Sequence, residues 1–202
     1  MKELARRFVR CLRSRENVVY RYDGDVPGEP VLPESLSWCK ADVRTVQALI
    51  RDDVNRQRRL MKNIAAGATG VIIHDGNHWA AHGLLAPPGV ALPSHLPAEM
   101  VEAYWWLFHM HTRPEWRGHG LQKACTRLRL RMALHRTTIY GNNNTPTVLT
   151  DTNHSNVPSR RCFQRLGFEP LGVVRTLKLR VPKLGSYLLR YRWNKNEVHS
   201  AI

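Results

Sequence analysis

The chain has 202 residues, of which 43% are apolar and 23% charged, and its formal net charge at pH 7 is +15. This length suits a single domain that buries a sizeable core. The composition is that of a soluble globular protein, and no apolar run reaches the length that a membrane-spanning helix needs.

The positive charge predicts attraction to polyanions, among which nucleic acid, an acidic carrier protein, an anionic glycan and a phosphorylated cofactor all qualify. The basic residues are spread along the chain, without zinc-finger spacing or an aromatic RNA-binding signature. The four cysteines form no CxxC pair and no secretory context accompanies them. We therefore expect a reduced, cytoplasmic protein.

The first segment, residues 1–15, is not a signal peptide, because charged residues interrupt its apolar positions. Its pattern favours a short basic helix packed on the domain, with a helix on a membrane surface as the alternative. We divide the chain into this helix, residues 1–16, and one domain, residues 17–202.

The next elements begin with a β-rich strand at residues 17–22 and a turn-rich loop at residues 23–33. Asp42 is a candidate cap for a helical segment that ends at Gly67. In an alternative interpretation, a break divides this segment into two helices. Two strands, at 69–74 and 78–85, are joined by a tight turn. Residues 86–97 hold four prolines and form a loop long enough to help shape a pocket.

The second half begins with an aromatic stretch, residues 103–112, which predicts a central strand covered on both faces. A helix at residues 121–135 and a strand at 146–152 follow. Asn156 caps a short helix that Gly167 terminates, and strands at 173–180 and 186–193 complete the sheet. This order predicts one mixed α/β domain.

The clearest chemistry lies in the turn TRPEWRGHGLQ, residues 112–122. Its two glycines let the backbone approach a ligand closely at a helix start, where unpaired N–H groups and the helix dipole favour an anion. Arg117 adds a fixed positive charge. The pattern therefore predicts a pyrophosphate site, although an ordinary strand-to-helix turn also uses glycines.

This turn resembles the pyrophosphate motif of the GNAT (GCN5-related N-acetyltransferase) family, Q/R-x-x-G-x-G/A. Arg117, Gly120 and Gln122 fall on its three defined positions, and Gln122 replaces the usual small residue. Residues 156–168 resemble the family's second signature, N-x-x-A-x-x-x-Y-x-x-L-G-F, with Ser159 and Phe163 replacing the alanine and the tyrosine. The resemblance implies a single α/β GNAT-like domain whose mixed sheet is splayed between its fourth and fifth strands and flanked by helices.

The resemblance also implies N-acetyl transfer from acetyl-CoA, without a metal, to a primary amine that attacks the thioester directly. The residues that it assigns to acetyl-CoA are Met110, His111, Thr112, Arg117, Gly118, His119, Gly120, Leu121, Gln122, Asn156 and Phe163. Many relatives use a tyrosine at the position of Phe163 to protonate the leaving thiolate, and phenylalanine has no proton to give.

For the catalytic base we consider Asp151 first, because some relatives carry a glutamate near that position; a solvated strand-end carboxylate is the alternative. Tyr104 and Glu102 are the next candidates. Strict alternation places Tyr104, Trp106, Phe108 and Met110 on one face of the strand, and His109 and His111 on the other unless a bulge shifts it. We interpret the two histidines as structural rather than metal ligands.

Two other functions stay open. One is a long-chain N-acyltransferase of the same fold that takes its acyl group from an acidic acyl carrier protein, which the charge of +15 would suit. The other is a non-catalytic module that binds coenzyme A or nucleic acid. The acceptor is an amine-bearing small molecule, a sugar or a peptide, and the sequence leaves a dimer open.

Overall fold

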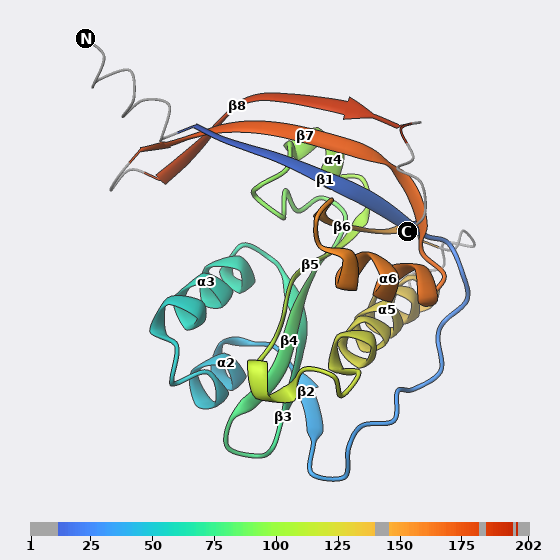
Figure 1. The fold of residues 1–202 in the computed structure, drawn as a ribbon. Coiled ribbons are helices and arrows are strands. Elements are labelled where there is room, and N and C mark those ends of the chain that lie inside the picture. The colour runs from blue at the N-terminus through green and yellow to red at the C-terminus, as the bar shows by residue number, and fades with distance from the viewer. Residues whose placement is uncertain (1–11, 140–145, 182–184, 196, 198–202) are drawn as a thin grey trace.

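The structure is a computed structural model that describes residues 12–139, 146–181, 185–195 and 197. One eight-stranded sheet runs through it in the order β2-β3-β4-β5-β6-β1-β7-β8, with helices on both faces (Figure 1). The strands are β1 (Leu12–Tyr22), β2 (Ser37–Lys40), β3 (Thr69–His74), β4 (Trp79–Ala86), β5 (Trp105–Thr112), β6 (Val148–Asn153), β7 (Glu169–Val181) and β8 (Gly185–Asn194).

The helices are α2 (Val43–Leu49), α3 (Val54–Ala65), α4 (Ala98–Val101), α5 (Leu121–Ile139) and α6 (Val157–Arg165), with a 3₁₀ turn η1 at Pro114–Trp116. Figure 1 shows α2 and α3 on one side of β3, β4 and β5, and α5 and α6 on the other. We call these sides the α3 face and the α5 face. None of the helices in the described ranges combines the length and apolar character that a bilayer crossing requires.

The central strands β5 and β6 run parallel but pair at only three positions, the last of which joins Leu107 to Thr150. Every other neighbouring pair of strands is antiparallel. Beyond Leu107 and Thr150 the two strands diverge and leave an opening in the sheet. This divergence confirms the expected splay, since β5 and β6 are the fourth and fifth strands of the sequence-based prediction.

A β-bulge bends β5 immediately after this last pair. The register between β4 and β5 shifts between His82 and Leu84, and His109 has a φ of 56°, which is unusual for a residue with a side chain. Arg129 of α5 is fully buried under the bulge and donates hydrogen bonds to the carbonyls of Leu84 (2.9 Å) and Phe108 (3.3 Å). The bulge is therefore a supported feature of the fold.

The two faces of the sheet have separate cores. On the α3 face, Trp106 and Phe108 of β5 pack with apolar residues that include Val46, Ile50 and Leu60 of the two helices. On the α5 face, Trp105 and Leu107 pack with residues that include Leu130, Phe163 and Phe168. The alternation expected for the first half of β5 is thus observed, and residues 105–108 are buried on both sides.

The helix ends follow their capping residues. Asp42 begins α2 with a capping box, in which its carboxylate accepts from the Thr45 N–H (2.8 Å) and Thr45 Oγ1 accepts from the Asp42 N–H (2.9 Å). Asp53 caps α3 through one bond, in which its carboxylate accepts from the Arg56 N–H (2.8 Å). The segment before Gly67 is therefore two helices, the alternative left open by the sequence.

Three expectations need correction. The basic helix falls largely on residues outside the described ones, but residues 12–16 belong to β1, because they continue its pairing with β7. The four-residue strand β2 and the one-turn helix α4 were not expected. In addition, α5 continues to Ile139 rather than ending at residue 135.

Candidate active site

The opening between β5 and β6 brings together residues from distant parts of the chain. Thr150 closes it at one end, where its hydroxyl donates to the Leu107 carbonyl (2.9 Å). Phe108 and His109 are the next residues on β5, and Asp151 is the next on β6. Asp151 therefore stands at the point where the strands part, as the first polar group beyond the last pair.

The Asp151 carboxylate is nearly inaccessible, with 4% of its side chain exposed. It accepts three hydrogen bonds, from Asn17 Nδ2 (2.6 Å), His95 Nε2 (2.8 Å) and Trp106 Nε1 (3.2 Å). Burial alone would raise its pKa, but the charge of His95 and the three hydrogen bonds outweigh burial, so the pKa of Asp151 lies below its ordinary value. The group is an ionised, fully engaged carboxylate.

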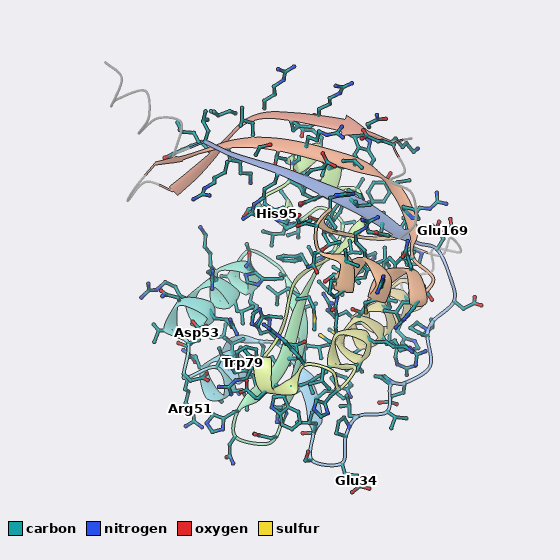
Figure 2. All side chains as sticks on the ribbon, in the orientation of Figure 1. Glu34, Arg51, Asp53, Trp79, His95 and Glu169 are labelled. Atoms are coloured by element: carbon teal, nitrogen blue, oxygen red, sulfur yellow. The ribbon has the colours of Figure 1, made fainter. Side chains whose placement is uncertain are left out.

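His95 was not among the residues selected from the sequence. It lies on the proline-rich loop between β4 and α4, and Figure 2 shows it beneath β1. Its side chain remains 33% exposed while its Nε2 contacts Asp151. Because the carboxylate is ionised, Nε2 carries the proton in neutral His95, and Nδ1 is left as the basic nitrogen. The only signal in the sequence was a histidine in a loop expected to shape a pocket.

The turn after β5 has the geometry of an anion site. Gly118 and Gly120 adopt positive φ angles of 85° and 71°, and no atom lies within 4 Å of where a Cβ would stand on either residue. The first helical bond of α5 runs from Ala124 N to the Gly120 carbonyl, and among the described residues no acceptor faces the N–H groups of residues 121–123. These donors, together with the exposed Arg117, suit a phosphorylated ligand.

The start of α6 lies beside this turn. Gln122 Nε2 donates to Ser159 Oγ (3.1 Å), and Asn156 caps α6 by accepting from the Ser159 N–H (3.3 Å). Two of the three departures from the family motifs, Gln122 and Ser159, thus contact each other. Phe163 lies on the inner side of α6 with 4% exposure and packs against Tyr20 and Phe168 (centroid distances of 5.6 and 5.5 Å).

The bulge changes which side chains share a face beyond Phe108. Met110 packs against α5 and contacts Arg129, whereas the rings of His109 and His111 each lie 6.0 Å from that of His82. The alternation that grouped Met110 with Phe108 and opposed both histidines is therefore wrong beyond residue 108. The bulge, which the sequence prediction named as the exception, is the reason.

The three histidines His82, His109 and His111 form a compact group on the α3 face. Burial is the main cause that lowers the pKa of each, and nearby arginines add to it, so the group favours the neutral state. Neither ring nitrogen of the buried His82 has a hydrogen-bond partner in the described part of the chain. Within that part, no cluster of three or more histidine, cysteine or acidic side chains has the arrangement of a metal site.

The other two base candidates lie elsewhere. Tyr104 immediately precedes β5 and is 41% exposed, and Glu102 follows α4, where its carbonyl accepts from the Gly89 N–H. Both residues precede the end of β5 that is paired with β6, whereas the opening begins after Leu107. Among the described residues, neither side chain is a hydrogen-bond partner of Asp151, whose partners are Asn17, His95 and Trp106.

An open groove of roughly 670 Å³ lies on the α3 face next to the turn. The segment between α2 and α3, the indole of Trp79, His111 and the residues from Arg113 to Arg117 form its walls. Figure 2 shows Asp53 and Trp79 on this side of the sheet. Its charges are largely paired, because Arg113 binds Asp52 and Arg56 binds Asp53 (3.3 Å).

Comparison with solved structures identifies the fold. A GCN5-related N-acetyltransferase-like protein from Streptococcus suis has a TM-score of 0.57 and 15% identity, over 96% of this chain and 67% of its own. A Drosophila protein has a TM-score of 0.58 and 16% identity, over 90% and 56% of the two chains. A putative GNAT-family acetyltransferase from Novosphingobium aromaticivorans has a TM-score of 0.53 and 17% identity, over 82% and 64%.

No protein-family model and no curated protein sequence matches the chain. These three structures are larger than the chain, which spans between 56% and 67% of their lengths. At these identities the likeness concerns the fold: one open mixed sheet flanked by helices, as in GCN5-related N-acetyltransferases.

Proposed function

We propose that the protein transfers an acetyl group from acetyl-CoA to a primary amine. The observation that carries this proposal is the His95–Asp151 pair at the point where β6 diverges from β5, because β5 is the strand that leads directly into the anion-binding turn. A reactive group beside the middle of β5 and a phosphate cradle after its last residue suit a long, phosphorylated acyl donor.

In this proposal the turn and the start of α5 hold the pyrophosphate through residues 117–122, with Arg117 as the charged partner. The backbone of Met110, His111 and Thr112 lines the path from the turn to the opening, and Asn156 and Ser159 border it at the start of α6. Phe163 is assigned to the core under α6 instead of to the acyl donor, since its ring packs against two aromatic neighbours.

The chemical roles follow from the contacts of Asp151. A carboxylate that already accepts three hydrogen bonds and has a lowered pKa is a weak base, so we assign it to positioning. His95 Nδ1 is the base. The amine nitrogen attacks the thioester carbonyl carbon and its proton passes to Nδ1. The C–S bond then breaks, its electron pair leaves with sulfur, and the same proton neutralises the thiolate, so that the products are an amide and free coenzyme A.

The proposal is tested by incubating the protein with acetyl-CoA and a panel of primary amines, following thiol release and identifying the acetylated product by mass spectrometry. Octanoyl-CoA and an acylated acyl carrier protein are included as donors, because the charge of +15 also suits an acidic carrier. Amine-dependent thiol release with acetyl-CoA supports the proposal. Tight binding of acetyl-CoA without product from any amine contradicts it and favours a binding module.

A further inference from the structure

We propose that the amine acceptor carries a negatively charged group, a carboxylate or a phosphate, close to its amine. The reason is that the α3 face of the opening between β5 and β6 is bordered by cations that have no acidic partner. This inference rests on the proposed acetyl transfer and narrows its acceptor to one chemical class.

The first cations lie on β1 and β7, beside His95. Lys178 Nζ donates to the carbonyl of Ser94 (3.4 Å), the residue before His95. Arg15 is two residues from Asn17, which binds Asp151, so both side chains point to the same face of β1. Burial and the charge of Arg15 lower the pKa of Lys178, while Asp151 raises it, which places all three charges within electrostatic reach.

Another cation comes from α3 on the opposite side of the opening. Arg59 is exposed, and after burial its charge is the strongest influence that lowers the pKa of His109, the bulge residue. Arg56, one turn earlier, is already bound to Asp53 and stacked over Trp79 (4.2 Å to the ring centroid). Within the described residues, neither Arg59, Arg15 nor Lys178 forms an ion pair with an acidic side chain.

The nearby acids do not offset this charge. Asp52 and Asp53 are bound to Arg113 and Arg56, and Asp151 is bound to His95. A simple alkylammonium ion would therefore meet repulsion at the opening. An amine that also carries an anion is attracted by the anion, and the same cations lower the pKa of its ammonium group. Such an acceptor binds and also loses its proton more readily.

The experiment compares matched acceptors that differ only in the anionic group, at saturating acetyl-CoA. The pairs are O-phosphoethanolamine with ethanolamine, and β-alanine with β-alaninamide. A further pair tests whether the anion comes from a peptide or from a small molecule. It compares a peptide that has acidic residues after its free N-terminus with the same peptide in which these residues are replaced by the corresponding amides. We expect kcat/KM to favour the anionic member of a pair by about tenfold or more, with the preference falling as salt increases.

Variants locate the effect. Arg59→Gln and Arg15→Gln should each reduce the preference by about threefold or more, mainly through KM for the anionic acceptor. Arg58→Gln is the matched control, since it removes the same charge from the neighbouring exposed position of α3 and should leave the preference unchanged. Equal losses in Arg58→Gln and Arg59→Gln would mean that only the overall charge matters and would overturn the assignment.

Binding measurements separate this inference from the proposed function. The imidazole signals of His95 and His109 are followed by NMR during titration with O-phosphoethanolamine and with ethanolamine. Shifts with the phosphorylated amine alone support the inference, even if no amine is acetylated and the proposed function fails. Turnover that is equal or better with neutral amines overturns the inference and leaves the function standing. Absence of both turnover and shifts overturns both.

Discussion

At the scale of single residues, Asp151 determines what His95 can do. The carboxylate is held by Asn17 from β1 and Trp106 from β5, so its position is fixed by two strands of the sheet. His95 comes from a loop, and its contact with Asp151 Oδ2 at 2.8 Å orients an otherwise adaptable side chain. A rigid carboxylate therefore gives a loop histidine one defined tautomer and one direction.

The role of His95 is tested by His95→Asn, which keeps a polar side chain but removes the basic nitrogen. We expect kcat for acetyl transfer to fall by about 10²- to 10⁴-fold, the usual contribution of a positioned base, with little change in acetyl-CoA affinity. His78→Asn is the control, because His78 lies in the exposed turn between β3 and β4. Wild-type kcat in His95→Asn would remove His95 from the reaction.

The lowered pKa of Asp151 has a consequence for stability. A carboxyl group whose pKa is lower in the folded than in the unfolded state stabilises the fold above the unfolded pKa of ~3.9, and this contribution is lost as the pH falls through the folded pKa. Asp151→Asn should therefore cost about 2 kcal/mol of unfolding free energy at pH 7.

This difference should shrink below about pH 4, as the wild-type carboxylate becomes protonated. The positive groups that face Asp151, His95 and Lys178, favour its ionised form in the fold. Urea unfolding of both proteins between pH 7 and pH 3 measures the difference. A constant difference over this range would show that size and hydrogen bonding, rather than charge, account for the effect.

At the scale of elements, the turn and helix after β5 form a unit that the sequence predicts well. Glycines at defined spacing and a basic residue are local requirements of an anion cradle, so they can be recognised without knowing the fold. The bulge in β5 could not be predicted in this way. Its support, Arg129, comes from another element, and nothing in the sequence around His109 indicates a positive φ.

The turn is tested by Gly120→Glu, which adds bulk and negative charge to the cradle. Acetyl-CoA affinity, measured by calorimetry, should fall by at least tenfold, because a like charge meets the pyrophosphate. Gly76→Glu is the matched control: Gly76 also has a positive φ, of 99°, and open space around its Cβ position, but it lies in the turn between β3 and β4. Unchanged affinity in a folded Gly120→Glu variant would rule the turn out.

At the scale of the whole molecule, motif order and strand order together predict the sheet and its opening. Motif order and strand order do not predict an element that is very short, or one whose pairing strand is distant in the sequence. The four residues of β2 are too few for a periodic signal, and residues 12–16 look helical until their pairing with β7 is known. The meeting of His95 with Asp151 joins a loop to a strand 56 residues away, and no local pattern encodes it.

The arrangement predicts that ligand binding stabilises the fold as a unit. The bond between Gln122 and Ser159 joins the start of α5, next to the turn, to the start of α6. Acetyl-CoA at 100 times its dissociation constant should stabilise the folded state by about 2.7 kcal/mol. At a fixed acetyl-CoA concentration, the accompanying rise in Tm, measured by differential scanning fluorimetry, should decrease as salt increases, because salt weakens the binding of an anionic ligand to a basic site. A salt-independent rise would contradict an electrostatic site.

The buried arginine under the bulge also restricts how this sequence can evolve. A Cβ on Gly83 would lie 2.6 Å from Arg129 Cζ, so Gly83→Ala alone forces an overlap that we expect to cost about 1–3 kcal/mol. After Arg129→Met the same change should cost much less, although Arg129→Met itself removes the hydrogen bonds to the carbonyls of Leu84 and Phe108. A double-mutant cycle measures this coupling, and additive effects would refute it. If coupling is found, replacement of Gly83 during evolution would be favoured only after Arg129 had been replaced. The structure would then restrict the order in which these two positions can change.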